Sequence, residues 1–204
     1  MNLLRKIRRR IAKLLYSKIV FDVYMFDLLN SNIPEQIVRS AEKLKIVFLH
    51  EISSDNISVL RRAEKLPGME HEEIISLFAN SNSLVLTFFN DRISHYAWIA
   101  KKERVVNDQT IISLSEDEAF IFKCFTIDCF RGNNYYSWTL GKILEQLKRE
   151  QTKSVRIDTL STNKASVKGV LKAGFSIERS FTYHNYLSII KVCKVREDIR
   201  NCNL

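Results

Sequence analysis

A polar turn between two hydrophobic segments carries the residues best suited to hold a ligand. The segment Cys124-Phe-Thr-Ile-Asp-Cys-Phe-Arg-Gly-Asn-Asn-Tyr-Tyr-Ser137 joins a predicted buried strand over 118–127 to a predicted long helix over 133–150. The first backbone N–H groups of a helix have no partner inside the helix, and the helix dipole adds positive potential there. The turn therefore predicts an anion site, suited to a pyrophosphate, on the N–H groups of residues 132–137.

Two further polar signals follow this turn along the chain. The first is Asn163-Lys-Ala-Ser166 and the second is Lys172-Ala-Gly174-Phe175. Asn163 suits the N-cap of the helix that follows it, and Gly174 suits the residue just after the end of that helix. Each residue has this purely structural explanation, so ligand binding is indicated by their combination with the turn.

In this combination the chain resembles the GNAT family of acyl-CoA-dependent N-acetyltransferases. The core motif of that family is Arg/Gln-x-x-Gly-x-Gly/Ala at a strand-to-helix turn, followed by an Asn and by a Gly-Phe pair. Arg131-Gly132 matches the start of the motif, Asn163 matches the Asn, and Gly174-Phe175 matches the pair. The resemblance is carried by residues 118–177 and extends in element order over 44–195. It does not cover the first 43 residues.

The chain departs from the family pattern at three positions. Asn134 and Tyr136 stand where the family has Gly or Ala. Asn is the best substitute for Gly in the left-handed region, whereas Tyr136 is bulky where cofactor phosphates should sit. Many family members also have a Tyr that protonates the departing thiolate, and the corresponding residue here is Val170, which cannot donate a proton.

The resemblance implies an N-acetyltransferase that moves an acetyl group from acetyl-CoA to a primary amine of a small molecule or amino sugar by direct attack. The new oxyanion would be stabilised by a backbone N–H of the strand, near residues 125–127. Asn163 would bond the pantetheine amides, and no metal is needed. The implied cofactor-binding residues are Phe125, Thr126, Ile127, Arg131, Gly132, Asn133, Asn134, Tyr135, Tyr136, Ser137 and Asn163.

The general base and acid of such a reaction are not identified by any motif. Predicted strands next to the cleft carry four titratable candidates, namely His95, Glu118, Tyr183 and His184. A base is needed because the amine must lose a proton before it attacks. Each of the four is equally explained as an ordinary core or surface residue.

Two alternative functions remain open. An acyl-carrier-protein donor would bring pantetheine without a free nucleotide, and so would tolerate the loss of the phosphate-binding glycines. Such carriers are usually acidic, and a basic segment could dock them. Alternatively, the fold could serve as a catalytically silent binding or membrane-associated module, which would agree with Tyr136 and Val170.

Hydrophobic periodicity predicts the elements that position these residues. Helices are predicted over 33–43, 55–65, 70–80, 133–150 and 164–172. Strands are predicted over 19–29, 44–52, 83–89, 93–101, 118–127, 155–160, 176–183 and 186–195. The expected fold class is an α/β (α+β mixed-sheet), GNAT-like fold, with a mostly antiparallel sheet of about six or seven strands and helices on both faces.

Composition is that of one globular domain. The chain has 204 residues, of which 46% are hydrophobic and 27% charged. This apolar content excludes disorder as the main state. No apolar run approaches the roughly 18 residues of a spanning helix. Four cysteines in a chain of this length predict reduced thiols in the cytoplasm rather than a disulfide framework.

The net charge of +9 is concentrated at the N-terminus. Residues 1–21 carry seven Lys and Arg and no acid, which leaves +2 for the other residues. Apolar residues recur there at helical spacing, so we expect a basic amphipathic helix over 1–18, followed by a single domain over 19–204. The helix could pack on the domain, or it could bind an anionic membrane surface or an acidic protein.

Further expectations on partners follow from the same segment. No aromatic-rich basic motif accompanies the charge, which argues against a nucleic acid partner. The expected location is the cytoplasm, with peripheral attachment at the inner membrane surface as an option that residues 1–18 leave open. The sequence does not decide the oligomeric state.

Overall fold

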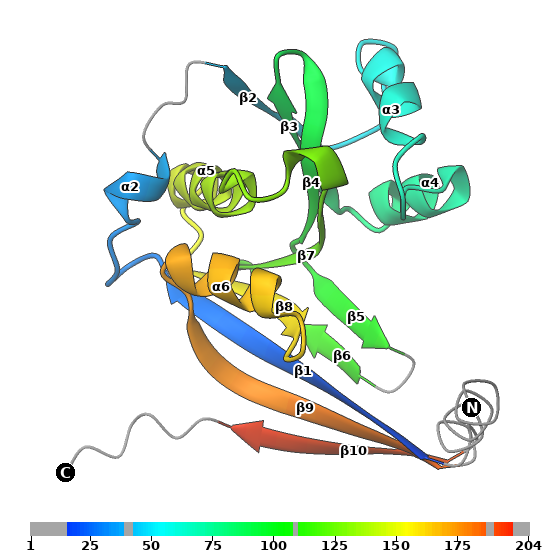
Figure 1. Cartoon of the computed structure of the whole chain (residues 1–204), viewed down its shortest axis with the longest axis vertical. Coiled ribbons are helices and arrows are strands. Elements are labelled where there is room, and N and C mark those ends of the chain that lie inside the picture. The colour runs from blue at the N-terminus through cyan, green and yellow to red at the C-terminus, as the bar shows by residue number, and fades with distance from the viewer. Residues whose placement is uncertain (1–15, 39–42, 108–109, 187–189, 198–204) are drawn as a thin grey trace, which may run out of the picture.

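A mixed sheet of eight strands forms the centre of the protein. The computed structural model describes residues 16–38, 43–107, 110–186 and 190–197. The strand order is β10-β9-β1-β8-β7-β4-β3-β2, and β5 and β6 form a separate two-stranded hairpin (Figure 1). The strands are β1 (Tyr16–Asp27), β2 (Leu44–Leu49), β3 (Ser83–Phe89), β4 (Arg92–Ala100), β5 (Glu103–Asn107), β6 (Thr110–Ser113), β7 (Glu118–Thr126), β8 (Ser154–Leu160), β9 (Ser176–Tyr186) and β10 (Ile190–Glu197).

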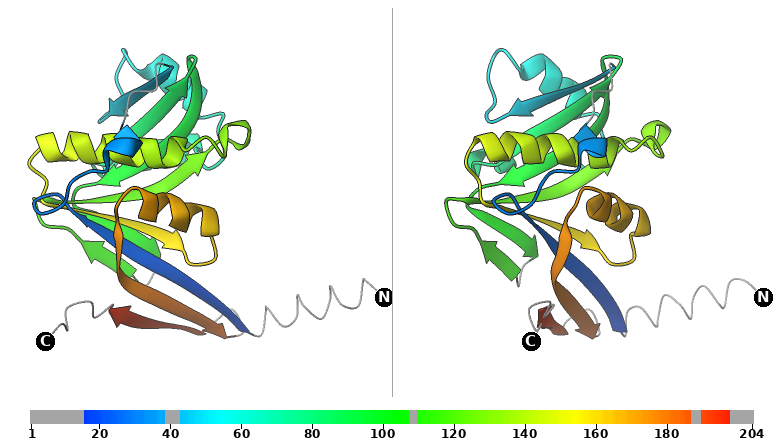
Figure 2. Two further views of the ribbon diagram at one scale, coloured as in Figure 1. Left: turned by 60° about the vertical axis from the view of Figure 1, so that its left-hand side comes forward. Right: turned by 90° about the vertical axis from the view of Figure 1, so that its left-hand side faces the viewer.

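Helices cover both faces of this sheet, as predicted. The helices are α2 (Glu35–Val38), α3 (Ile57–Ala63), α4 (His71–Ala79), α5 (Tyr135–Arg149) and α6 (Lys164–Lys172), with a short 3-10 turn η1 (Asp128–Phe130) before α5. Buried residues of α2, α5 and α6 form one core with the sheet. Those of α3 and α4 form a second core on the opposite face, next to the β5–β6 hairpin (Figure 2). The mixed α/β fold class is therefore confirmed.

The predicted number of strands is wrong, because the sheet has eight rather than six or seven. Each of the eight strands overlaps a range predicted from the periodicity, including β1, which overlaps the strand predicted over 19–29 in the part of the chain that the family resemblance does not cover. β1 inserts between β8 and β9 and pairs antiparallel with both. Residues 16–18, which the sequence assigned to the basic helix, are part of β1, and residues 1–15 lie outside the described residues.

The structure bears on two other parts of the predicted element order. Of the helix predicted over 33–43, the described part is α2 (Glu35–Val38), and residues 39–42 lie outside the described residues. The β5–β6 hairpin was not predicted. Its strands are short, and the hydrophobic residues Val105 and Ile111 are 48% and 59% exposed, so the hydrophobic pattern of the sequence does not follow the alternating burial of these strands.

The feature that matters most for a site is the junction of β7 and β8. These neighbours run parallel and pair over Glu118–Ile121 with Ser154–Ile157. Beyond this point residues 122–126 of β7 and 158–160 of β8 are not paired with each other. The sheet is therefore split along its middle, and backbone groups at the inner edges of both strands are available to a ligand.

A bulge in β7 lies at this split. Phe122 is paired with Trp98 of β4, and Phe125 is paired with Tyr96, so β7 holds one extra residue between these pairs. Lys123 has a φ of 48°, in the left-handed region. An extra residue bends its strand and redirects its side chains, so residues on either side of Lys123 face different cores.

Among the described residues, no helix is both long and apolar enough to cross a membrane.

Because β1 lies inside the sheet, we expect that disrupting its packing causes a large loss of stability. Phe26 is 2% exposed, and its ring centroid lies 5.6 Å from that of Phe175. Phe26→Ala should lower the free energy of unfolding by about 3–5 kcal/mol, since a buried cavity is left. Leu29→Ala, at a residue that is 66% exposed, should change it by no more than about 0.5 kcal/mol. Urea denaturation measures both, and equal losses would contradict a central β1.

Candidate functional site

A cavity of about 490 Å³ lies between the free part of β7, the start of α5 and α6. It contains most of the residues that the sequence predicted for cofactor binding. These are Phe125, Thr126, Arg131, Gly132, Asn134, Tyr135, Tyr136, Ser137 and Asn163. Ile127 and Asn133 are not among the lining residues: Ile127 packs on the opposite core, and the Asn133 amide donates to the Phe130 and Arg131 carbonyls.

The turn before α5 has the backbone geometry that an anion site requires. Gly132 has a φ of 82° and Asn134 a φ of 60°. Asn134 therefore adopts the left-handed conformation expected of it in place of a glycine. The first intrahelical bond of α5 is donated by the Trp138 N–H to the Asn134 carbonyl. The N–H groups of residues 135–137 precede this bond and have no partner inside the helix.

Positive charge surrounds this turn. Arg131, Lys168 and Lys172 line the cavity, whereas no Asp or Glu is among its lining residues. The Lys172 ammonium donates to Asn134 Oδ1 at 2.9 Å, which ties α6 to the turn. Arg131 forms an exposed ion pair with Asp128 at 2.8 Å. The two lysines lie one helical turn apart on α6, where they can both reach an anion on the α5 N-terminus.

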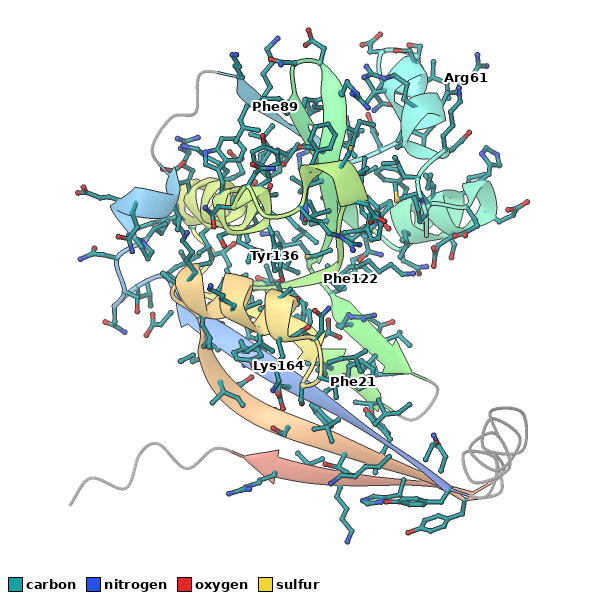
Figure 3. The ribbon with its side chains drawn as sticks, viewed as in Figure 1. Phe21, Arg61, Phe89, Phe122, Tyr136 and Lys164 are labelled. Carbon is teal, nitrogen blue, oxygen red and sulfur yellow. The ribbon has the colours of Figure 1, made fainter. Side chains whose placement is uncertain are left out.

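The bulky Tyr136 is accommodated by a glycine on the neighbouring helix. A Cβ atom built on Gly169 would lie 2.4 Å from Cδ1 of the Tyr136 ring, which no real Cβ contact allows. The ring also lies 5.3 Å from that of His95. Tyr136 thus forms part of the cavity wall between α5 and α6 (Figure 3). The sequence offered one signal of this contact, since glycine in a helix interior costs stability and usually has a packing reason.

His95 is a buried and incompletely bonded group in the wall. It is 1% exposed, and its Nδ1 shares a hydrogen bond of 2.8 Å with Thr126 Oγ1. Its Nε2 is buried and has no hydrogen-bond partner in the described part of the chain. Burial lowers the pKa of His95 from its usual 6.5 to about 3. The ring is therefore neutral near pH 7, too weak to deprotonate an ammonium group but able to form a hydrogen bond with a ligand.

Burial also keeps two other polar groups of the cavity neutral. It raises the pKa of the Cys124 thiol, and the negative charge of Asp158 adds to this effect. Burial likewise raises the pKa of the Tyr136 hydroxyl, which lies 3.4 Å from Ser166 Oγ. Cys124 is therefore a protonated thiol in this wall and not an activated nucleophile.

The other predicted acid–base candidates lie outside the cavity lining. Glu118 is bound to Arg156 at 2.6 Å, in the part of β7 that is still paired with β8. The Tyr183 hydroxyl donates to Thr110 Oγ1 at 2.8 Å, and His184 shares a hydrogen bond with the Tyr16 hydroxyl. The structure thus brings only His95 of the four into the cavity lining.

Asn163 and Val170 have clear structural roles. The Asn163 side chain accepts a hydrogen bond from the Ser166 N–H at 3.2 Å, so it caps α6 while it also lines the cavity. Val170 is fully buried in the core under α6. Within the described ranges, no cluster of three or more His, Cys, Asp or Glu could hold a metal ion.

The contact of Tyr136 with Gly169 makes a testable prediction. Alanine is favoured over glycine in a helix by about 1 kcal/mol, yet Gly169→Ala should lower the free energy of unfolding by about 1–3 kcal/mol because of the clash. In the Tyr136→Ala background the same change should instead stabilise the protein. Urea denaturation of the four proteins gives the coupling energy, and additive effects would show that the two residues are not in contact.

Buried His95 predicts a pH dependence of stability. Its folded pKa of about 3 lies below the unfolded value of 6.5, so the unfolded chain binds the proton first. The full stability is present above pH 6.5 and is lost as the pH falls toward 3, by about 2 kcal/mol between pH 7 and 5. Denaturation at several pH values should show that His95→Gln removes this loss, whereas His50→Gln, at an exposed residue, retains it.

Solved structures with a similar fold include several N-acetyltransferases. No protein-family model and no curated protein matches the sequence. A GCN5-related N-acetyltransferase from Sphaerobacter thermophilus aligns with a TM-score of 0.56 and 10% identity, over 90% of this chain and 56% of that one. A GCN5-related N-acetyltransferase-like protein from Streptococcus suis aligns with a TM-score of 0.57 and 8% identity, over 91% of this chain and 68% of that one.

A third similar structure is the glucosamine N-acetyltransferase region of a fungal multi-domain GH3 beta-N-acetylglucosaminidase. It aligns with a TM-score of 0.58 and 14% identity, over 87% of this chain and 22% of that one. The chain thus spans little more than half the length of the Sphaerobacter protein and about a fifth of the fungal protein. At these identities the similarity concerns the fold. The chain has the fold of the GNAT N-acetyltransferases.

Proposed function

We propose that this protein is an acyl-CoA-dependent N-acetyltransferase, which transfers the acetyl group of acetyl-CoA to a primary amine of a small molecule or amino sugar. The observation that carries the proposal is the split between β7 and β8, with a cavity that runs from it to the N-terminus of α5. A long, thin ligand with an anionic end matches this combination of a free strand edge and a positive helix end.

Named residues fit each part of such a donor. The phosphates would lie on the N–H groups of residues 132–137, with Lys168 and Lys172 beside them. The amides of the pantetheine arm would pair with the free edge of residues 122–126 of β7. The His95 Nε2, which has no partner among the described residues, would gain a hydrogen bond from the arm.

The residues of the cavity suit direct transfer better than a covalent intermediate. The amine nitrogen forms a bond to the thioester carbonyl carbon and loses a proton, the C–S bond breaks, and the sulfur leaves as a thiolate that takes up a proton. A backbone N–H of the free part of β7 would stabilise the oxyanion. The Tyr136 hydroxyl keeps its proton at neutral pH, because burial raises its pKa, and it could donate a hydrogen bond to the leaving sulfur.

The class of acceptor is supported by one of the structures with a similar fold. The fungal relative in fold is described as a glucosamine N-acetyltransferase region, which supports an amino sugar.

Calorimetric titration of the full chain with acetyl-CoA tests this function. We expect saturable one-site binding with a Kd on the order of micromolar, and weaker binding of 3′-dephospho-CoA if the outer phosphate contacts the lysines. The double variant Lys168→Gln and Lys172→Gln should bind about tenfold more weakly, because charge next to the phosphates is lost. Lys148→Gln, in the last turn of α5, is the matched control. Absence of acetyl-CoA binding would refute the proposal and favour a carrier-protein donor or a non-catalytic module.

Substitutions at Asn134 test the turn itself. Asn134→Gly keeps the left-handed backbone and should leave acetyl-CoA binding unchanged or tighter. Asn134→Val should weaken it by about tenfold or more, because a β-branched residue is strained at a φ of 60°. The same titration measures both. Equal affinities of the two variants would show that phosphates do not bind on this turn.

A further inference from the structure

A second cavity, of about 450 Å³, lies on the opposite side of β7. Its walls are the end of α4 with the turn after it, the start of β5, and Phe122 and Lys123 of β7. Phe122 belongs to the core under α3 and α4, whereas Cys124 packs on the core under α5 and α6. Figure 3 shows Phe122 on the side of β7 toward β5, and Tyr136 between α5 and α6.

The bulge of β7 places the two cavities back to back. Phe122 and Lys123 line the second cavity, and the next residue, Cys124, lines the first. At this point β7 is paired with β4 but has no pairing with β8, so a single strand with one free edge separates the two cavities. A molecule in the second cavity would therefore approach the split from the side opposite to the proposed donor.

Arg104 is the most informative residue of the second cavity. Its guanidinium lies 4.6 Å above the centre of the Phe122 ring. Its Nη2 donates to Asp158 Oδ2 at 3.1 Å, and its Nη1 donates to the Val105 carbonyl. Its Nε is buried and has no hydrogen-bond partner in the part of the chain that is described. A buried donor without a partner is costly, and an acceptor oxygen of a ligand would satisfy it.

The lysines near Arg104 are not equally available to bind a ligand. The Lys123 ammonium is bound to Glu73. Lys102 forms a hydrogen bond to Ser81 Oγ at 3.3 Å and has no ion-pair partner among the described residues. Glu103 also lines this cavity, so its charge is mixed. Lys102 and the Arg104 Nε are the donors on charged side chains that it can offer to an anionic ligand.

The ion pair with Asp158 connects Arg104, which lines the second cavity, to the point where β8 leaves β7. Asp158 is on β8, directly after the last residue that pairs with β7. Burial raises the pKa of Asp158, and Arg104 acts against this effect. Burial raises the pKa of Cys124, and the negative charge of Asp158 raises it further. The Arg104–Asp158 pair therefore lies close enough to act electrostatically on a residue that lines the first cavity.

We propose that the second cavity binds the amine acceptor, and that this acceptor carries a carboxylate or phosphate group held by Arg104 and Lys102. The inference rests on the proposed function and adds the chemical class of the acceptor. The anionic group lies at the β5 side of the cavity, and the amine end points toward the bulge of β7. The acceptor is therefore an acidic amine, such as an amino acid or an amino sugar phosphate.

The first test uses inorganic phosphate and acetate as probes of the full chain. Nitrogen-15 NMR follows the Arg104 Nε–H group during titration with each anion at constant ionic strength. We expect a saturable shift with at least one anion, and a several-fold weaker response in Lys102→Gln, where an exposed side chain is changed. The preferred anion distinguishes a phosphate from a carboxylate acceptor. Absence of a saturable shift with both anions would overturn the inference.

The second test compares acceptors that differ by the anionic group. Glucosamine 6-phosphate is paired with glucosamine, and lysine with 1,5-diaminopentane, and release of the thiol from acetyl-CoA gives kcat/KM. We expect at least a tenfold preference for the anionic member of one pair, lost mainly through KM in Lys102→Gln and retained in Lys148→Gln. Equal or better turnover of both neutral amines would overturn the inference.

Two controls separate this inference from the proposed function. Binding of acetyl-CoA to Lys102→Gln should be unchanged, because Lys102 lines the other cavity. If Arg104→Gln fails to fold, because Asp158 is left unpaired, the double variant Arg104→Gln and Asp158→Asn removes both charges. A protein that binds acetyl-CoA but shows neither the anion response nor the preference contradicts the acceptor class alone. A protein that binds no acetyl-CoA contradicts the proposed function.

Discussion

The site depends on the point where β7 and β8 cease to pair. Up to Ile121 and Ile157 the backbone groups of the two strands are paired with each other. Beyond these residues the two strands are no longer paired. Unpaired backbone groups in the middle of a sheet are costly unless a ligand or water takes them. The bulge at Lys123 adds to the effect, since it sends neighbouring side chains to opposite faces. Cavities therefore lie on both sides of the same few residues.

Packing around the split compensates for a departure from the family pattern. Tyr136 stands where the family has a small residue, and Gly169 of α6 provides the space that its ring needs. Ser137 adds a second tie between these helices, since its hydroxyl donates to the Gly169 carbonyl at 3.3 Å. The bulky residue thus forms a wall of the cavity, which still extends from the split to the turn before α5.

Electrostatics divides the site into a charged rim and a neutral interior. Arg131, Lys168 and Lys172 lie at the exposed turn and on α6, where water solvates them. Inside, burial is the first cause of the pKa shifts of His95, Cys124 and Tyr136, and all three shifts favour the neutral form. The same desolvation strengthens hydrogen bonds to a ligand. The interior is thus suited to hydrogen bonding rather than to proton abstraction from an ammonium group.

The sequence by itself determined most of the elements, though not the β5–β6 hairpin, and the local geometry of the turn. Hydrophobic periodicity gave the order of strands and helices on which the fold class rests, and the left-handed conformation of Asn134 follows from the chemistry of that side chain. These properties are local, because backbone sterics and the alternation of side chains act over a few residues. The N-cap role of Asn163 could be predicted from the sequence for the same reason.

Only the tertiary structure decided which distant residues meet. The insertion of β1 between β8 and β9, the contact of Tyr136 with Gly169, and the pairing of Arg104 with Asp158 all join segments that are far apart in sequence. Hydrophobic periodicity does not predict which distant segments meet, because strand order and side-chain contacts depend on how whole elements pack. Asp158 shows the limit most clearly. Alternation placed it on one face of its strand, but its position beside the split depends on where β7 stops pairing with β8.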